Sequence, residues 1–348
     1  MKGLSILNKL LFVLNSLSLL LLIFSYLSPY INPNLFWPIS FLGLVFPILF
    51  ILNMLFLVYW LIGLKKQIWA NMIILIMGIG YFSSYIGLDP NNKSNESNIK
   101  VLTYNVRLFN KYKWIDEQDV KSKILNFFKK EKADILCIQE FYTKDTVPSL
   151  DYEFRHIGLQ SEKSKWHMAI YSNYKQINKQ TVSLNGERMN NTCIFSDMII
   201  KEDTFRIYNI HLASNWFNSS DYSFILNPKK EKIKEGLTGI SNRMRASYNK
   251  RANQVTVIRK HMNTSPYPII VCGDFNDTPL SYAYNIIKGE LNDAFSLSAK
   301  GIGTSYIKIP ALRIDYIMHD SSFKSTNYQK HSEELSDHYA ISCEITIP

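Results

Sequence analysis

The chain has 348 residues and a formal net charge of +10, and apolar residues make up 47% of it. This length leaves room for two or more structural units. A basic balance favours an anionic partner, such as a phosphate-bearing polymer or an anionic membrane surface. The four cysteines include no close pair, which argues against a Cys-ligated zinc site or a small disulfide framework.

The apolar residues are concentrated near the N-terminus. No Asp, Glu, Lys or Arg occurs between Lys9 and Lys65, and a second uncharged stretch runs from Gln67 to Leu88. About 20 apolar residues span a bilayer. These stretches therefore predict three transmembrane helices, over residues 4–27, 35–64 and 68–88, the second of which is long and contains prolines that favour a kink. A cleaved signal peptide followed by core helices is the alternative, although no small-residue cleavage site follows the first apolar run.

Four lysines set the expected orientation. Lys2 and Lys9 lie at the N-terminal end of the first span, and Lys65 and Lys66 lie between the second and third, whereas residues 28–34 carry no charge. Because cytoplasmic loops carry an excess of Lys and Arg, we expect a multi-pass protein whose later residues lie on the extracytoplasmic side. Residues 89–98 are polar and rich in turn formers, which predicts a short flexible tether.

Residues 99–348 have the composition of a soluble domain with recurring apolar runs. The expected strands are Ile99–Asn105, Asp134–Gln139, His167–Ser172, Thr192–Ile200, Thr204–Leu212, Pro268–Gly273, Arg313–His319 and Tyr339–Ile345. Helical periodicity is present over residues 120–128 and 252–262, and a third helix is expected from Pro279 with Thr278 as its N-cap. Many strands with a few helices between them predict a layered α/β domain with packed sheets.

The four cysteines lie in these apolar runs and are expected to be small buried hydrophobic side chains. They are Cys137, Cys193, Cys272 and Cys343. A disulfide on the outer side of a membrane stays open as an alternative, although the spacing does not favour one.

Polar residues recur where the apolar runs meet loops. They are Asn105, Glu140, His211, Asp274, Asn276, Asp315, Asp337 and His338. Each has an ordinary explanation as a turn residue, a solvated strand end or a hydrogen-bonded core histidine, but together they indicate a site at one edge of the sheets. The cluster at residues 274–277 costs free energy in an apolar setting unless a cation or hydrogen bonds satisfy it. Asp277 is expected mainly to help start the next helix.

The motifs TYNVR, IQE, NIHL, GDFND, RIDYI and SDHYA occur in this order. In this respect residues 99–348 resemble the endonuclease/exonuclease/phosphatase superfamily, which includes deoxyribonuclease-like enzymes, inositol polyphosphate 5-phosphatases and neutral sphingomyelinases. The resemblance implies a four-layered α/β sandwich with its active site at one end of two packed sheets. It also implies a divalent-metal-dependent hydrolase of phosphoester bonds.

The resemblance implies roles for individual residues. Glu140 would be the main ligand of a hard cation, Mg²⁺ or alternatively Mn²⁺ or Ca²⁺, with Asn105 beside it. Asp337 would bind the metal directly or through water. Asp274 would activate or orient the attacking water, and Asn276, two residues further along an extended chain, would point the same way.

Three residues complete the expected chemistry. His338 would donate to a phosphate oxygen, and Asp315 would set the tautomer and orientation of that histidine. His211 would stabilise the phosphate or protonate the leaving oxygen; abasic-site endonucleases carry a different residue in this motif. Because members of the superfamily differ in their general base, proton transfer is assigned jointly to Asp274, His211 and His338.

A segment rich in aromatic and basic residues follows the NIHL motif. The aromatic residues are Trp216, Phe217, Tyr222 and Phe224, and ten Lys or Arg lie between Lys229 and Lys260. Nucleic acid would bind there through its phosphates and stacked bases, and anionic lipid headgroups would bind equally well. A solvated helix face with a loop is the ordinary explanation.

Three functions remain open. The first is a phosphodiesterase or nuclease acting outside the cytoplasmic membrane. The second is a lipid-headgroup phosphodiesterase or phosphatase, which tethering favours because the bilayer supplies substrate at high effective concentration. The third is a membrane-anchored binding or scaffolding protein with an inactive site. No feature of the sequence indicates a protein partner.

Overall fold

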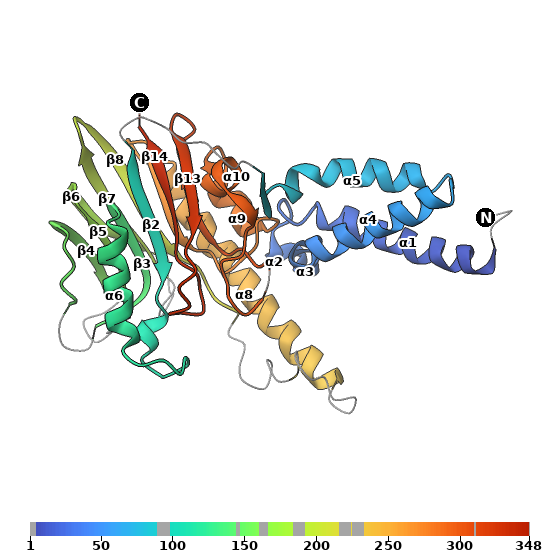
Figure 1. Ribbon diagram of the computed structural model, residues 1–348, viewed down its shortest axis with the longest axis horizontal. Helices are drawn as coiled ribbons and strands as arrows, with labels where there is room; N and C mark the ends of the chain where they lie inside the picture. Colours follow the sequence, from blue (N-terminus) through green and yellow to red (C-terminus); the bar gives the residue numbers. More distant parts are fainter. Residues whose placement is uncertain are drawn as a thin grey trace. The chain divides into compact units, whose positions relative to one another are not determined.

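The computed structural model describes residues 5–88, 98–143, 147–159, 166–183, 192–215, 224, 233–309 and 311–347 (Figure 1). The chain divides into two compact units. The helical unit comprises Met1–Tyr85, Asn215–Ala252 and Asp277–Ile286, and the sheet unit comprises Ile86–Ser214, Asn253–Asn276 and Ile287–Pro348. Most of the expected tether, at residues 89–97, lies outside the described residues.

The helical unit consists of short and medium-length apolar helices. They are α1 (Ile6–Ser25), α2 (Pro33–Phe36), α3 (Pro38–Leu44), α4 (Phe46–Ile62) and α5 (Ile68–Phe82), together with the first part of α8 (Ile233–Met262). Among the described helices, only α1, with 20 residues, is by itself long and apolar enough to cross a membrane. Helices α3 and α4 pass the same test as a pair bent by 64°, whereas α5 has 15 residues.

The three expected continuous spans therefore do not all form. The second is broken at Val45, next to Pro47 in the first turn of α4, because proline cannot donate to a preceding turn of helix. The third ends at Phe82, before a turn and a short strand, and not at Leu88. One helix, α1, is supported as a span by its length and composition.

The bundle of α1, α4 and α5 buries polar side chains and exposes apolar ones. Nδ2 of Asn15 donates to Oδ1 of Asn71 over 2.9 Å and to Oδ1 of Asn53 over 3.3 Å, and Nε1 of Trp60 donates to Oδ1 of Asn15 over 2.8 Å. All four side chains are buried, and Leu, Ile and Val side chains of the same helices, such as Leu17 and Leu55, are exposed. This distribution is the reverse of the usual one in water.

The sheet unit is built on two six-stranded mixed sheets. The first has the strand order β13 (Lys324–Lys330), β14 (Ile341–Thr346), β2 (Ile99–Asn105), β3 (Ile135–Tyr142), β5 (Trp166–Ser172), β4 (Phe154–Leu159). The second has the order β10 (Asn292–Asp293), β12 (Asp315–His319), β9 (Ile269–Asp274), β8 (Asp203–His211), β7 (Thr192–Ile200), β6 (Lys175–Val182). Strands β2 and β3 pair in parallel, as do β8 and β9, and the other pairs are antiparallel. A separate short pair joins β1 (Ile86–Leu88) to β11 (Lys300–Ile302).

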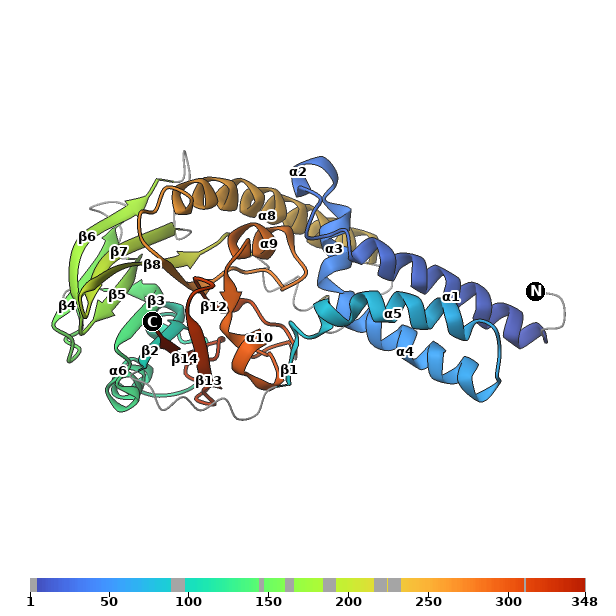
Figure 2. The same ribbon diagram turned by 90° about the horizontal axis from the view of Figure 1, so that it is seen from above.

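Helices cover the outer faces of both sheets, so the unit has four layers (Figures 1 and 2). Apolar side chains from both sheets form the central core, including Cys137, Cys272 and Cys343. On the first sheet, α6 (Val120–Glu131) buries Phe127 and Phe128 against Tyr104. On the second sheet, residues 253–262 of α8 pack on β7 and β8, where the Tyr208 hydroxyl lies 2.9 Å from Nδ1 of His261. The expected four-layered α/β sandwich is confirmed.

The secondary structure agrees with the sequence-based expectation in the sheet centres and differs at three places. Six strands were not expected: β4, β6, β10 and β13 are each the last strand of a six-stranded sheet, and β1 and β11 form the separate short pair. The helix expected over residues 252–262 is the end of the 30-residue α8. The third expected helix does not begin at Pro279: α9 (Tyr282–Lys288) begins three residues later, where Oγ of Ser281, not of Thr278, accepts from the Tyr284 N–H.

All four cysteines are free and buried, as expected.

Two small elements complete the unit. They are the 3₁₀ turn η1 (Arg107–Asn110) and the helix α10 (Ala294–Ser298).

Candidate active site

Three neighbouring strands of the second sheet bring three of the expected residues to one edge. Asp274, at the end of β9, pairs in register with His211 at the end of parallel β8 and with Asp315 at the start of antiparallel β12. Gly273 makes this approach possible, because it has a φ of +137° and a Cβ there would lie 1.9 Å from the Ile210 carbonyl oxygen. The glycine of the GDFN motif is thus required by the packing of β9 against β8.

The first sheet contributes Asn105 and Glu140 from the adjacent strands β2 and β3. Nδ2 of Asn105 donates to Oδ2 of Asp274 over 3.0 Å and lies 3.4 Å from Oε1 of Glu140, so the amide connects the two sheets. Glu140 has a φ of +48° and lies where the register of β3 with β5 shifts between Ile138 and Phe141. A bulge of this kind re-aims a side chain away from the alternation of the strand.

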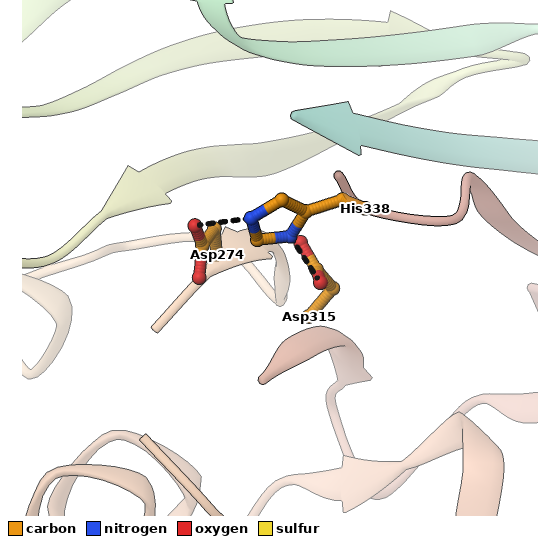
Figure 3. A group of neighbouring side chains, drawn as sticks. All are labelled: Asp274, Asp315 and His338. Atoms are coloured by element: carbon orange, nitrogen blue, oxygen red, sulfur yellow. Dashed lines mark hydrogen bonds and ion pairs between the residues drawn. The ribbon is translucent and has the colours of Figure 1, made fainter. Parts of the chain in front are cut away.

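His338 lies between two carboxylates (Figure 3). Its Nδ1 is 2.8 Å from Oδ2 of Asp315, and its Nε2 is 3.7 Å from Oδ2 of Asp274. Burial lowers the pKa of His338, but the negative charges of Asp315 and Asp274 outweigh burial and raise that pKa to about 10. We therefore assign His338 as an imidazolium at neutral pH, able to donate from both ring nitrogens.

Asp274 is the most enclosed carboxylate of the group. Burial raises its pKa, and the negative charge of Asp315 raises it further, while His338 and His211 act in the opposite direction. Nε2 of His211 lies 3.7 Å from Oδ2 of Asp274 and equally far from Oε1 of Glu140. The two histidines thus approach Asp274 from two sides.

Glu140 marks the open side of the site, because its side chain is 28% exposed and those of His211, Asp274 and His338 are nearly inaccessible. Its partial removal from water raises its pKa, and the nearby charge of Asp337 adds to this effect while His211 opposes it. The negative charges of Glu140 and Asp337 also favour the binding of a cation at this side.

Asn276 holds Asp274 in place. Its backbone N–H donates to Oδ1 of Asp274 over 2.8 Å, and its Nδ2 donates to Oδ2 over 3.1 Å and to the Leu212 carbonyl over 3.0 Å. The chain is not extended here as expected: Asn276 has a φ of +52°, which Asn tolerates better than most residues. Its side chain nevertheless lies against the carboxylate of Asp274.

Asp277 has a different partner from the one expected. Within the helical unit, its carboxylate forms a buried ion pair with Nε of Arg251 over 2.9 Å, and it accepts from the Thr278 N–H. It therefore does not cap the next helix, which Ser281 does.

Asp337 and three residues not identified from the sequence complete the surroundings. Oδ2 of Asp337 lies 3.2 Å from Nε of Arg107. The Ser336 hydroxyl donates to the Asn105 carbonyl, and the Ser305 hydroxyl accepts from the Asp315 N–H. Arg107 belongs to the TYNVR motif, so the sequence could have identified it as a residue near the site. The sequence around Ser305 contains no motif that would have done so.

Buried amides also escaped the sequence analysis. Nε2 of Gln139 donates to Oδ1 of Asn209 over 2.6 Å and to Oγ1 of Thr103 over 2.9 Å, and Nδ2 of Asn209 donates to the carbonyls of Ile138 and Ala169. This network joins β8 to the first sheet behind the site, and Oε1 of Gln139 is its one buried side-chain atom without a hydrogen-bond partner in the described structure.

The oxygen donors at the open side suit a hard divalent cation. Glu140 and Asp337 offer carboxylate oxygens, which are the ligands that Mg²⁺ prefers. Asp274, Asp315 and His338 form a second, buried group whose ligand atoms lie within 4.8 Å of one another. In that group the 2.8 Å contact of His338 with Asp315 is a hydrogen bond that occupies both atoms, so it is better suited to holding protons.

A buried histidine held between carboxylates, with oxygen donors at the open side, is an arrangement that can transfer protons and bind a cation. A family model described as "Endonuclease/Exonuclease/phosphatase family" matches residues 102–338, and a model described as "Domain of unknown function (DUF8431)" matches residues 8–85. The chain belongs to the endonuclease/exonuclease/phosphatase family, and its sheet unit is a phosphoesterase-type hydrolase. No curated protein matches the chain significantly.

Solved structures share the fold at low sequence identity. A functionally unknown conserved protein from Enterococcus faecalis V583 is similar with a TM-score of 0.56 and 15% identity, covering 72% of this chain and 100% of that one. Humanized D. rerio TDP2 gives a TM-score of 0.53 and 14% identity, with 72% and 100% covered. The human Nocturnin catalytic domain with bound sulfate gives 0.50 and 16%, with 76% and 97% covered.

Proposed function

We propose that the protein is a membrane-anchored, divalent-metal-dependent phosphodiesterase that acts on nucleic acid. The observation that supports hydrolysis best is the placement of His338 between Asp315 and Asp274 at the closed end of a site whose open end carries Glu140. The basic balance of the chain favours a polyanionic substrate.

The metal would be held by Glu140, with Asp337 as a second carboxylate, directly or through water. When bound, Mg²⁺ would polarise a phosphoryl oxygen and offset the charge that develops in the transition state. Asn105 turns its Nδ2 toward Glu140 and Asp274, and its Oδ1 accepts from the Arg107 N–H. In this orientation Asn105 would help to position the carboxylates of Glu140 and Asp274.

The buried residues would handle protons and the phosphate. His338, charged and fixed by Asp315, would donate from Nε2 to a phosphate oxygen. Asp274, fixed by Asn276 and Asn105, would orient the attacking water and accept its proton. His211 would stabilise the phosphate or protonate the leaving oxygen. Proton transfer is thus assigned jointly to Asp274, which would accept a proton, and to His211 and His338, which would donate.

Membrane anchoring is supported by the inverted polarity of the bundle of α1, α4 and α5. Polar side chains inside a bundle, with Leu and Ile outside it, are typical of helices that associate in lipid. We propose that α1, the bent pair α3–α4 and α5 all insert. The positions of Lys2, Lys9, Lys65 and Lys66 then favour an extracytoplasmic sheet unit.

The test is a panel assay on the full chain in nanodiscs with Mg²⁺. Plasmid DNA, RNA, sphingomyelin, phosphoinositides and a bis-aryl phosphate diester are offered in parallel, with His338→Gln as the inactive control. We expect cleavage of nucleic acid and of the aryl diester that stops on addition of chelator. Cleavage of lipid alone would overturn the nucleic-acid assignment, and activity undiminished by chelator would overturn the role of the metal.

A lipid-headgroup phosphodiesterase or phosphatase is the second candidate function. The observation that favours it is the apolar exterior of α1, α4 and α5, because a lipid substrate would be concentrated in the same bilayer. The lipid arms of the same assay distinguish the two candidates.

A further inference from the structure

The loop between β2 and α6 carries an exposed aromatic pair beside the site. Tyr112 is 53% exposed and Trp114 is 44% exposed. In the part of the sheet unit that the structure describes, no other aromatic side chain is exposed to this extent. Two neighbouring exposed aromatic side chains are unusual on the surface of a soluble domain, and they often mark a binding surface.

The base of this loop is rigidly held. Leu108 and Phe109 are buried, and the Phe109 ring packs against Phe141 with centroids 5.5 Å apart. Four consecutive residues, Arg107 to Asn110, have left-handed φ values between 42° and 57°. Such conformations cost about 1–3 kcal/mol each in non-glycine residues and persist where the surrounding structure enforces them, typically at functional sites.

The tip of the loop is closed by one side chain. Nδ2 of Asn110 donates to the Ile115 carbonyl over 2.8 Å, and Oδ1 of Asn110 accepts from the Ile115 N–H over 3.0 Å. These two bonds fix residues 111–114, with the sequence Lys-Tyr-Lys-Trp, as a short protrusion. The aromatic pair is therefore preorganised, with its ring centroids 5.1 Å apart at an angle of 67°.

Cations connect this tip to the candidate metal ligands. The Arg107 guanidinium lies 4.3 Å from the Trp114 ring centroid, and its Nε lies 3.2 Å from Oδ2 of Asp337. Nζ of Lys111 lies 4.0 Å from the ring centroid of Tyr142, which follows Glu140 by two residues on β3. The tip is therefore connected through Arg107 to Asp337, and it contacts the strand that carries Glu140.

We propose that Tyr112 and Trp114, with Lys111 and Lys113, form a subsite for the nucleotides that flank the scissile phosphate of a single strand. The rings would stack on bases, and the two lysines would pair with neighbouring phosphates. The subsite rests on the proposed nuclease function, which it deepens by assigning a single-stranded substrate.

The chemistry of the loop favours nucleic acid over a lipid surface. A segment that inserts below the headgroups of a bilayer presents a continuous apolar face, on which residues such as Leu and Phe are exposed. Here the apolar Leu108 and Phe109 are buried, Ile115 is half-buried, and only rings and lysines occupy the tip. The alternation of lysine and aromatic side chains over residues 111–114 matches the alternation of phosphates and bases along a single strand of nucleic acid.

The test is direct binding to the full chain in nanodiscs with chelator present, so that cleavage plays no part. One fluorescent probe is a short oligothymidylate, and the second is an abasic strand of the same length and charge. For Trp114→Ala we expect binding of oligothymidylate to weaken by about tenfold, while binding of the abasic strand changes by less than about twofold. Trp114→Phe should retain most of the affinity for oligothymidylate, because it keeps a ring.

The matched control is Ile177→Ala, which removes an exposed apolar side chain on β6, far along the second sheet from this loop. It should bind both probes as the unmodified protein does. Lys111→Gln with Lys113→Gln should weaken binding of both probes and reduce its dependence on salt.

Three results would overturn the subsite. One is unchanged binding of oligothymidylate by Trp114→Ala, and a second is an equal loss of affinity for both probes. For the third, vesicles containing phosphatidylserine serve as an additional probe, and a loss of affinity confined to these vesicles would assign the loop to a lipid surface. If the unmodified protein instead prefers bases in this assay but cleaves no phosphodiester, the subsite stands and the proposed hydrolysis fails.

Discussion

Nδ1 of His338 lies 2.8 Å from Oδ2 of Asp315, a bond that joins the loop before β14 to the first residue of β12. The backbone N–H of Asp315 is itself held by the Ser305 hydroxyl. The orientation of His338 therefore depends on strand pairing in the second sheet. The neighbouring Asp274 then lies on the free side of the ring.

Asp315→Asn should lower turnover of a bis-aryl phosphate diester by about 10²- to 10⁴-fold, because an amide neither stabilises the imidazolium nor selects the reactive tautomer. The assay compares turnover numbers in nanodiscs with Mg²⁺. Asp203→Asn, an exposed residue at the opposite end of β8, is the control and should retain full turnover. Comparable rates for the two variants would contradict the assigned role of Asp315.

Glu140→Gln should weaken Mn²⁺ binding and diester turnover, each by about 10- to 100-fold or more, since the variant removes a charged ligand at the open side of the site. Isothermal titration with Mn²⁺ measures the affinity. Glu153→Gln, on an exposed segment of the sheet unit, is the matched control. An unchanged titration would remove Glu140 from the metal site, and unchanged behaviour in both assays would favour an inactive scaffolding protein.

The pKa of about 10 for His338 predicts a dependence of stability on pH in the absence of metal. The folded pKa lies above the ordinary value of about 6.5, so the stabilising contribution is complete below that pH and is lost as the pH rises toward 10. The free energy of unfolding should fall by up to about 1.4 kcal/mol per pH unit in this window.

Urea denaturation followed by the circular dichroism of the sheets, with chelator present, measures this slope. His338→Gln should remove the slope between about pH 6.5 and 10, because glutamine does not titrate. The same slope in the variant would show that another group is responsible.

Asn15→Leu should destabilise the bundle of α1, α4 and α5 by about 0.6–2 kcal/mol. The change removes the acceptor of Trp60 Nε1 and both bonds to Asn71. Thermal unfolding in micelles measures the effect. Ser16→Leu is the matched control on the same helix, because Ser16 is exposed and bonds only its own helix, to the Phe12 carbonyl. Equal stability of the two variants would show that the buried amides do not hold the bundle together.

Sequence patterns predicted the centres of the sheets well and their edges poorly. Central strands such as β9 are buried on both faces and read as continuous apolar runs, as Ile269–Cys272 does. The last strands, β6 and β13, have the polar sequences KQINKQTV and KSTNYQK. Edge strands face solvent and are often made polar to prevent aggregation, so hydrophobic patterning does not reveal them.

A polar residue that follows a buried strand is easy to identify from the sequence. Asn105, His211 and Asp274 were identifiable for this reason, and the structure brings them together. The sequence also named Glu140 and Asn276 as site residues, but it did not predict their backbone conformation or the partner of Asp277. Glu140 is aimed by a bulge, Asn276 is in a left-handed conformation, and Asp277 pairs with a residue 26 positions away, none of which has a periodic signature.

By itself, the sequence determined that apolar strands end in carboxylates, amides and histidines, because the polarity and length of a strand depend on residues that are neighbours in the chain. Only the tertiary structure decided which of these groups touch. The pairing of β9 with β8 and β12 places His211 and Asp315 on either side of Asp274, and that adjacency depends on strand order. Contacts between residues far apart in the chain are set by packing and register, which no short stretch of sequence encodes.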